Sequence, residues 1–400
     1  MTTAIIISIC VLLIIAYVFD LTASKTKIPS VILLLLLGWG VRQLTDLFSI
    51  EIPDLNALLP AFGTIGLILI VLEGSLELEF NRSKLSVLRK SFTVALLSLV
   101  ALAFVLALVL NYYYGYSFKT ALINAIPLCV ISSAVAIPSV KNQIASSKEF
   151  IVYESSLSDI IGILFFNFMA FNETINASSF GYFGLDLLIM LIISFIATIG
   201  LSFLLSRIDH HIKFAPIVVL IILIYEISKV YHLPALLFIL LFGLFLGNLD
   251  ELKRFKWIDK LNPAMLDKEV HKFSELVVEG TFLVRASFFL LFGFLIKTSE
   301  IINPETLLLA LFTVAAIMLI RYLMLKIFRL PVNPLLFIAP RGLITILLFV
   351  SIPPESVISD VNKSLIIQVI IISALLMMIG LMFSKSNKTA SLPDVSEITP

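Results

Sequence analysis

The sequence has few charged residues, cysteines or histidines, which are the residues on which most soluble enzymes and metal sites depend. Only 14% of its 400 residues are charged, whereas about a quarter are charged in an average soluble domain. Its two cysteines, Cys10 and Cys129, both lie in apolar runs, which argues against a disulfide or metal framework. With 60% apolar residues, the chain is predicted to be a polytopic membrane protein. Neither a resident cofactor nor a nucleic-acid partner is expected.

Long apolar runs make up most of the chain instead. A helix needs about 20 apolar residues to cross the bilayer, and on that basis the chain divides into about thirteen predicted spans. They cover roughly residues 4–22, 29–46, 57–78, 88–111, 119–140, 149–172, 183–206, 213–230, 233–249, 274–296, 304–328, 331–352 and 364–384. Residues 1–384 are therefore predicted to form one all-α transmembrane unit, followed by a short cytoplasmic tail at 385–400.

Basic residues are distributed unevenly between the predicted loops. Twenty of the 28 Lys and Arg residues follow odd-numbered spans, and only five follow even-numbered spans. By the positive-inside rule the odd-numbered loops are cytoplasmic, which places the N-terminus outside and the C-terminus inside. The remaining three, Arg285, Arg321 and Arg341, lie inside predicted spans. The role of Arg285 is left open.

Two predicted spans contain prolines around polar residues. Span five holds Ser132 and Ser133 between two prolines, and span twelve holds Arg341 in the segment PVNPLLFIAPRGLITI, residues 331–346. Proline removes a backbone hydrogen bond, so both helices are predicted to be interrupted, which membranes tolerate only where the backbone lines a buried or wet cavity. Interrupted helices of opposite direction mark the binding site of many transporters, and these three residues are expected to line it. Ordinary proline kinks are the alternative.

Span six carries two carboxylates in the segment FIVYESSLSDIIGILFFNFMAF, residues 150–171. At 1.5 Å per residue, Glu154 lies roughly 7 Å and Asp159 roughly 15 Å from the cytoplasmic start of the span. Arg321 of span eleven lies at a depth similar to that of Glu154, and the two are predicted to form a structural ion pair.

Asp159 is predicted near the midplane with no cation beside it. Oxygens of Ser155 and Ser158 could help to complete a site for a hard cation around its carboxylate. When no cation is bound, a buried carboxylate is expected to take up a proton instead. One group that holds either a cation or a proton, never both, is the minimal machinery of an antiporter. A polar group that only locks helix packing is the alternative.

These residues also lie in segments that match a known family. ESSLSD at 154–159, LEGSLELEF at 72–80, LIRYLML at 319–325 and APRGLI at 339–344 resemble motifs of the monovalent cation/proton antiporter superfamily, nearest its NhaP and NHE-like sodium/proton exchangers. The resemblance implies an inverted-repeat fold with two crossed discontinuous helices, as in the NhaA, NapA and NhaP proteins. It assigns cation and proton binding to Asp159.

The resemblance further implies a division of the chain and a mode of transport. A core domain of roughly 88–172 and 304–384 would move like an elevator against a dimerisation domain of roughly 4–78 and 213–296, with 183–206 as a linker helix. The expected protein is a homodimer in the bacterial cell membrane that exchanges one Na⁺ for one proton without net charge movement.

Two departures from the family pattern keep other functions open. Ser158 stands where the family has asparagine, and SSAVAIP at 132–138 lacks the aspartate of the family's Thr-Asp-Pro motif. The second departure is similar to the potassium/proton branch, so K⁺/H⁺ exchange is one alternative, and sodium-coupled symport of an organic solute is another. A channel would need a continuous polar path. An intramembrane protease would need a mid-membrane histidine or second aspartate.

Overall fold

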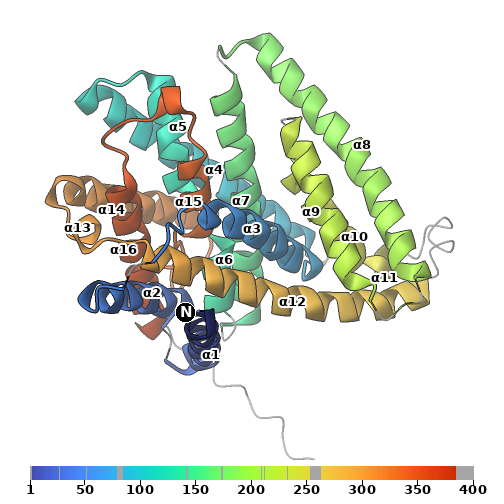
Figure 1. Ribbon diagram of the computed structural model, residues 1–400. Helices are drawn as coiled ribbons and strands as arrows, with labels where there is room; N and C mark the ends of the chain where they lie inside the picture. The colour runs from blue at the N-terminus through green and yellow to red at the C-terminus, as the bar shows by residue number, and fades with distance from the viewer. Residues whose placement is uncertain are drawn as a thin grey trace, which may run out of the picture.

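Helices are the only regular secondary structure among the described residues, which confirms the all-α prediction (Figure 1). The computed structural model describes residues 2–26, 28–50, 52–78, 84–140, 143–172, 174–208, 210, 212–231, 233–252 and 263–383. The expected tail at 385–400, the end of the 72–80 segment and several basic loop residues lie outside these ranges.

The helices follow the predicted spans in chain order. The first are α1 (Thr2–Thr26), α2 (Ser30–Leu47), α3 (Leu58–Leu76), α4 (Leu85–Tyr114), α5 (Phe118–Cys129), α6 (Ser133–Ser139) and α7 (Ala145–Phe171). They are followed by α8 (Ala177–Arg207), α9 (Phe214–Val230), α10 (Leu236–Gly247), α11 (Leu249–Leu252), α12 (Pro263–Phe294), α13 (Thr298–Ile301), α14 (Pro304–Ile327), α15 (Leu343–Val350) and α16 (Lys363–Phe383).

Nine helical segments in the described part of the chain are long and apolar enough to cross a membrane. The other four predicted spans correspond to α7, with its buried carboxylates, and to the shorter α9, α10 and α15. With 12 residues, α10 is only about 18 Å long, less than the roughly 30 Å of a bilayer core. The predicted number of crossings and the predicted orientation of the termini therefore stay predictions.

The helix α12 begins at Pro263, well before residue 274, where a span was predicted to start. Its first turns are amphipathic, with Lys268 and Lys272 exposed opposite a buried apolar stripe made of Leu266, Val270, Phe273 and Val277. An apolar-run criterion misses such turns because half of their residues are polar. The expectation that these lysines lie in a loop is wrong.

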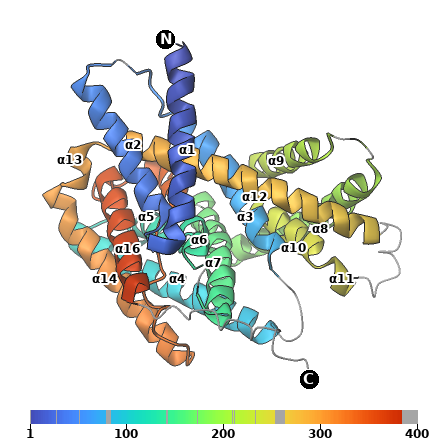
Figure 2. The same cartoon turned by 90° about the horizontal axis from the view of Figure 1, so that it is seen from below.

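The helices pack in two groups that contact each other in the interior. α4 packs against α5, α7 and α14, and α14 packs against α16, whereas α12 packs against α2 and α3, and α10 against α3 and α8. Figures 1 and 2 show α8 to α11 on one side, α14 and α16 on the other, and α12 running between the two sides. The division into a core and a dimerisation domain remains a prediction.

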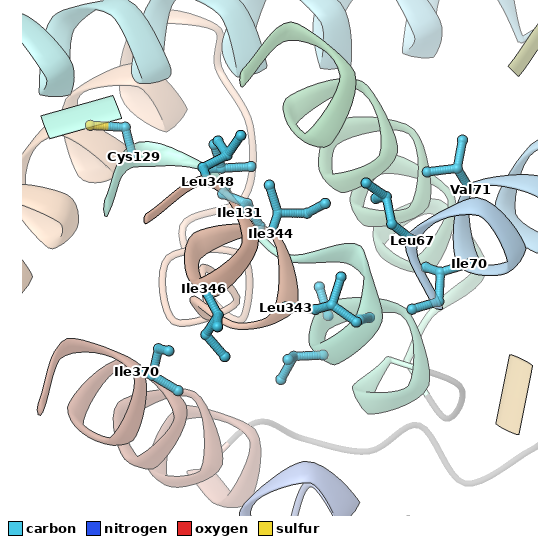
Figure 3. Close-up of a cluster of buried hydrophobic side chains, with 14 of the residues drawn as sticks. Leu67, Ile70, Val71, Cys129, Ile131, Leu343, Ile344, Ile346, Leu348 and Ile370 are labelled. Carbon is cyan, nitrogen blue, oxygen red and sulfur yellow. The ribbon is translucent and has the colours of Figure 1, made fainter. Parts of the chain in front are cut away.

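The short helix α15 lies at the centre of the packed interior. It contacts α3, α5 and α7. Figure 3 shows its apolar side chains among residues of α3, α16, the end of α5 and the break after it. The labelled residues are Leu67, Ile70, Val71, Cys129, Ile131, Leu343, Ile344, Ile346, Leu348 and Ile370. All ten are buried. This packing holds the start of α15, and the interrupted segment before it, in a defined place.

Gly38 of α2 lies directly against the backbone of α12. A methyl group at this position would lie 2.8 Å from Phe294 N and would also meet the carbonyl oxygen of Leu290. Because backbone atoms cannot turn aside, Gly38→Ala is expected to lower the free energy of unfolding by about 1–3 kcal/mol, measured by denaturant unfolding in detergent. Gly40→Ala is the matched control, since nothing lies within 4 Å of a methyl group there. Equal losses for the two variants would contradict this packing.

Candidate functional site

Two interrupted segments meet in the interior. α5 ends at Cys129 and α6 begins at Ser133, with extended backbone between them. Residues 331–342 form turns and extended backbone before α15 begins. The backbone N–H of Ser132 donates to the carbonyl oxygen of Pro340 at 2.9 Å, so the two interrupted segments are joined where they meet.

The first half of predicted span twelve is less regular than an interrupted helix. Pro331, Pro334 and Pro340 each lack the N–H that a helix needs at their position, and they fall in ten consecutive residues. Gly342 then allows close approach, since a Cβ here would lie 2.8 Å from Val135 and 2.9 Å from the hydroxyl of Ser132. This crossing of residues 130–133 and 339–342 positions the candidate site.

Asp159 of α7 is fully buried and faces the start of α6. Its Oδ2 accepts hydrogen bonds from the hydroxyl and the backbone N–H of Ser133. Its Oδ1 has no hydrogen-bond partner among the described residues. One carboxylate oxygen is therefore held in place by the protein, while the other is available to a ligand.

The hydroxyls of Ser155 and Ser158 make their hydrogen bonds elsewhere. Ser155 donates to the carbonyl oxygen of Ile151, one turn back in α7, at 2.7 Å. Ser158 accepts from the backbone N–H of Ile131 at 3.0 Å and so ties α7 to the break in span five. Their part in a cation site stays a prediction. Ser133, expected only to line the break, is the residue that holds Asp159.

Two more buried hydroxyls have no partner among the described residues: that of Ser132, at the crossing, and that of Thr345, three residues after Gly342 in α15. The hydroxyls of Ser98, Thr198 and Ser202 also lack one. Ser132 and Thr345 are fully buried. Ser132 was expected to line the site. Thr345 was missed, although its place one turn after a proline- and glycine-rich interruption is a signal that could have found it.

Glu154 and Arg321 lie together in the interior. The two Nη atoms of Arg321 donate to the two carboxylate oxygens of Glu154 at 2.8 and 2.9 Å. Side-chain exposure is 0% for Glu154 and 3% for Arg321, so water does not weaken this bidentate pair. The Nε of Arg321 also donates to the carbonyl oxygen of Leu335 at 2.6 Å. The pair thus joins α7 and α14 to the 331–342 segment.

Arg341 supports the crossing through backbone groups. Its Nε donates to the carbonyl oxygen of Leu128 at 2.7 Å and its Nη1 to that of Ala339 at 3.0 Å. Leu128 lies in the last turn of α5, where the carbonyls lack helical partners and carry partial negative charge. A cavity of about 20 Å³, lined by Ser98, Arg321 and Arg341 among others, has room for a water molecule.

Arg285 lies apart from the crossing. Its Nη2 is 3.6 Å from Oδ1 of Asp20, and the hydroxyl of Ser30 donates to the same oxygen at 3.2 Å. These contacts join α12, α1 and α2. The residue whose role the sequence left open therefore lies at a junction of three helices.

The comparisons with known proteins agree with this architecture. A family model described as "Sodium/hydrogen exchanger, transmembrane" matches residues 9–384. The structure of the sodium proton antiporter MjNhaP1 from Methanocaldococcus jannaschii at pH 8 has 20% identity and a TM-score of 0.67, with 94% of this chain and 99% of that chain covered. A 3D EM map of the same antiporter gives 19% identity, a TM-score of 0.67 and 95% coverage of each chain. No curated protein sequence matches the chain.

The structural likeness shows the fold, and the family model covers nearly the whole chain. The earlier resemblance to NhaP and NHE-like exchangers is confirmed. The chain belongs to the transmembrane sodium/hydrogen exchanger family, and it is a multi-pass membrane transporter that exchanges a cation for a proton, not an enzyme.

Proposed function

We propose that this chain exchanges one Na⁺ for one proton, and that Asp159 carries both in turn. The observation that carries the proposal is a fully buried carboxylate with one oxygen bound to Ser133 and the other unpartnered among the described residues. A hard cation prefers oxygen ligands. A proton on the same oxygen replaces the cation, so the two ions compete for one site, and this competition couples their movements.

The ion movement is proposed to be electroneutral. Ser158 has no titratable group, and position 321 is an arginine, a side chain that acts as a fixed cation in proteins. Glu154 is held in two hydrogen bonds by Arg321, so a change in its protonation would break a buried pair. Asp159 is then the group that changes its proton occupancy during the cycle, and one positive charge leaves as one enters.

Exchange is therefore expected to be insensitive to membrane potential. The measurement imposes a potassium/valinomycin potential on proteoliposomes while sodium-driven proton flux is followed with a pH-sensitive dye. The rate and the equilibrium point should match those measured at zero potential. A clear shift of either would reveal a second titrating group in the transport cycle.

Transport is proposed to follow an elevator motion in a homodimer. The packing of α4 against α5, α7 and α14, and of α14 against α16, supports a moving core, and the packing of α12 against α2 and α3 supports a fixed part. Exposed apolar side chains of α1, such as Ile6, Ile14 and Leu21, leave a face for lipid or a second copy. A monomer mass by light scattering contradicts the dimer, and full activity after the two parts are cross-linked contradicts the motion.

A cation screen tests the proposed function. Purified protein in liposomes is given Na⁺, Li⁺ or K⁺ in turn against a preset pH gradient, and only a transported cation dissipates the gradient. Sodium is expected to give the response with the lowest half-saturating concentration. Dissipation by K⁺ alone would select K⁺/H⁺ exchange, which the neutral Ser133 in place of an aspartate leaves open. No proton flux with any cation would favour the solute symporter.

A further inference from the structure

Buried hydroxyls in the continuous helices of this chain mostly donate to a carbonyl one turn back. Examples are Thr313, which donates to Leu309 at 2.8 Å, and Thr281, which donates to Val277 at 2.7 Å. This pattern is common for serine and threonine in membrane helices. Among the described residues, Ser98 of α4 and Thr198 and Ser202 of α8 are exceptions, and so are Ser132 and Thr345. The last two lie in or next to the interrupted segments, which gives their missing partners a physical explanation.

The interruptions themselves remove the usual partners. Ser132 lies between α5 and α6, and the carbonyl four residues earlier, that of Leu128, already accepts from Nε of Arg341. Thr345 is the third residue of α15, so the carbonyl four residues earlier belongs to Arg341, outside the helix. A buried hydroxyl without a partner costs free energy unless a ligand satisfies it.

The hydroxyl of Ser132 and the carboxylate of Asp159 lie at the crossing, and the place of Thr345 follows from its position in α15. Ser133, next to Ser132, holds the other oxygen of the same carboxylate. The hydroxyl of Ser132 lies 2.9 Å from the position of a Cβ on Gly342, the residue that caps α15. Thr345 follows Gly342 by three residues, which places it about one turn along on the same side of the helix.

We infer that Thr345 and Ser132 supply oxygen ligands to the transported cation, together with Oδ1 of Asp159; this inference rests on the proposed function of that carboxylate. The break in span five and the first turn of α15 then contribute to one shell with a single formal negative charge, which suits a monovalent cation. After the cation leaves and a proton binds Oδ1, the carboxyl O–H can donate to one of the same hydroxyls. Thr345 thereby becomes a residue that tunes cation affinity.

Thr345→Val tests this assignment because it removes the hydroxyl and keeps the shape. The expected result is an about tenfold higher half-saturating Na⁺ concentration for proton flux in liposomes, with a maximal rate within about twofold of the parent protein. Thr345→Ser keeps an oxygen and should stay near the parent value, and Ser132→Ala should act like Thr345→Val. Thr313→Val, at a buried threonine that is hydrogen-bonded within α14, is the matched control and should leave Na⁺ affinity unchanged.

Two outcomes overturn the inference. One is an unchanged half-saturating Na⁺ concentration in Thr345→Val, and the other is an equal change in Thr313→Val. If Thr345→Val does not fold in detergent, the comparison of Thr345→Ser with Thr345→Ala decides instead, and equal Na⁺ affinity in those two overturns it. If Asp159→Asn is inactive and Thr345→Val has the Na⁺ affinity and rate of the parent protein, only the proposed set of cation ligands is refuted. If Asp159→Asn still exchanges ions, the proposed function itself is refuted.

Discussion

Replacing Asp159 by asparagine is expected to abolish cation-driven proton flux in proteoliposomes while the protein still folds. The amide oxygen can accept the hydrogen bonds that Ser133 now donates to the carboxylate, so the local structure keeps its support. An amide cannot release a proton or neutralise a cation at working pH. The change therefore removes the exchanged charge and little else.

The control for this prediction is Asp186→Asn. Asp186 lies in α8, away from the crossing, and is only partly buried. That variant should exchange at the parent rate, and both variants should elute from a size-exclusion column as the parent protein does. Sodium-driven proton flux retained by Asp159→Asn would mean that another group carries the proton.

Breaking the Glu154–Arg321 pair is expected to give the largest loss of stability. Either Glu154→Ala or Arg321→Ala leaves one buried charge without its partner, which costs about 3–5 kcal/mol. The loss of unfolding free energy should be visible as a lower melting temperature in detergent. Arg321→Ala should be the worse of the two because it also releases the carbonyl oxygen of Leu335.

The double variant distinguishes a coupled pair from two independent side chains. Removing both charges together avoids the unpaired charge, so the double variant should recover part of the summed loss. Recovery should be incomplete, since the carbonyl of Leu335 still loses its donor. Strictly additive losses would mean that the two side chains do not stabilise each other. Lys84→Ala is a control, because Lys84 and Glu149 form a partly exposed pair whose loss should cost about 1 kcal/mol or less.

Local sequence determined the membrane fold and which charged residues are buried within it. The length of an apolar run predicts a membrane-spanning helix without any knowledge of tertiary contacts, because the thickness of the bilayer sets the length of each helix separately. Charged residues within spans can also be identified from the sequence alone. Placing a charge inside the membrane costs free energy, so such residues are rare, and Glu154, Asp159 and Arg321 stand out. The criterion of apolar run length also explains why the start of α12 was predicted at residue 274 and not at Pro263. Its first turns are amphipathic, so they do not form part of a long apolar run.

Only the tertiary structure decided how these residues meet. A sequence does not show that Ser133 holds Asp159 or that Arg341 donates to the carbonyl of Leu128. Nor does it show that the hydroxyl of Ser132 has no partner in the described part of the chain. These contacts depend on where two interrupted segments cross, and crossing is set by the packing of helices distant in the chain. Thr345 became a candidate ligand for the same reason. Its hydroxyl has no partner among the residues that the structure describes, and the backbone before it is not helical, which is a property of the fold and not of the residue.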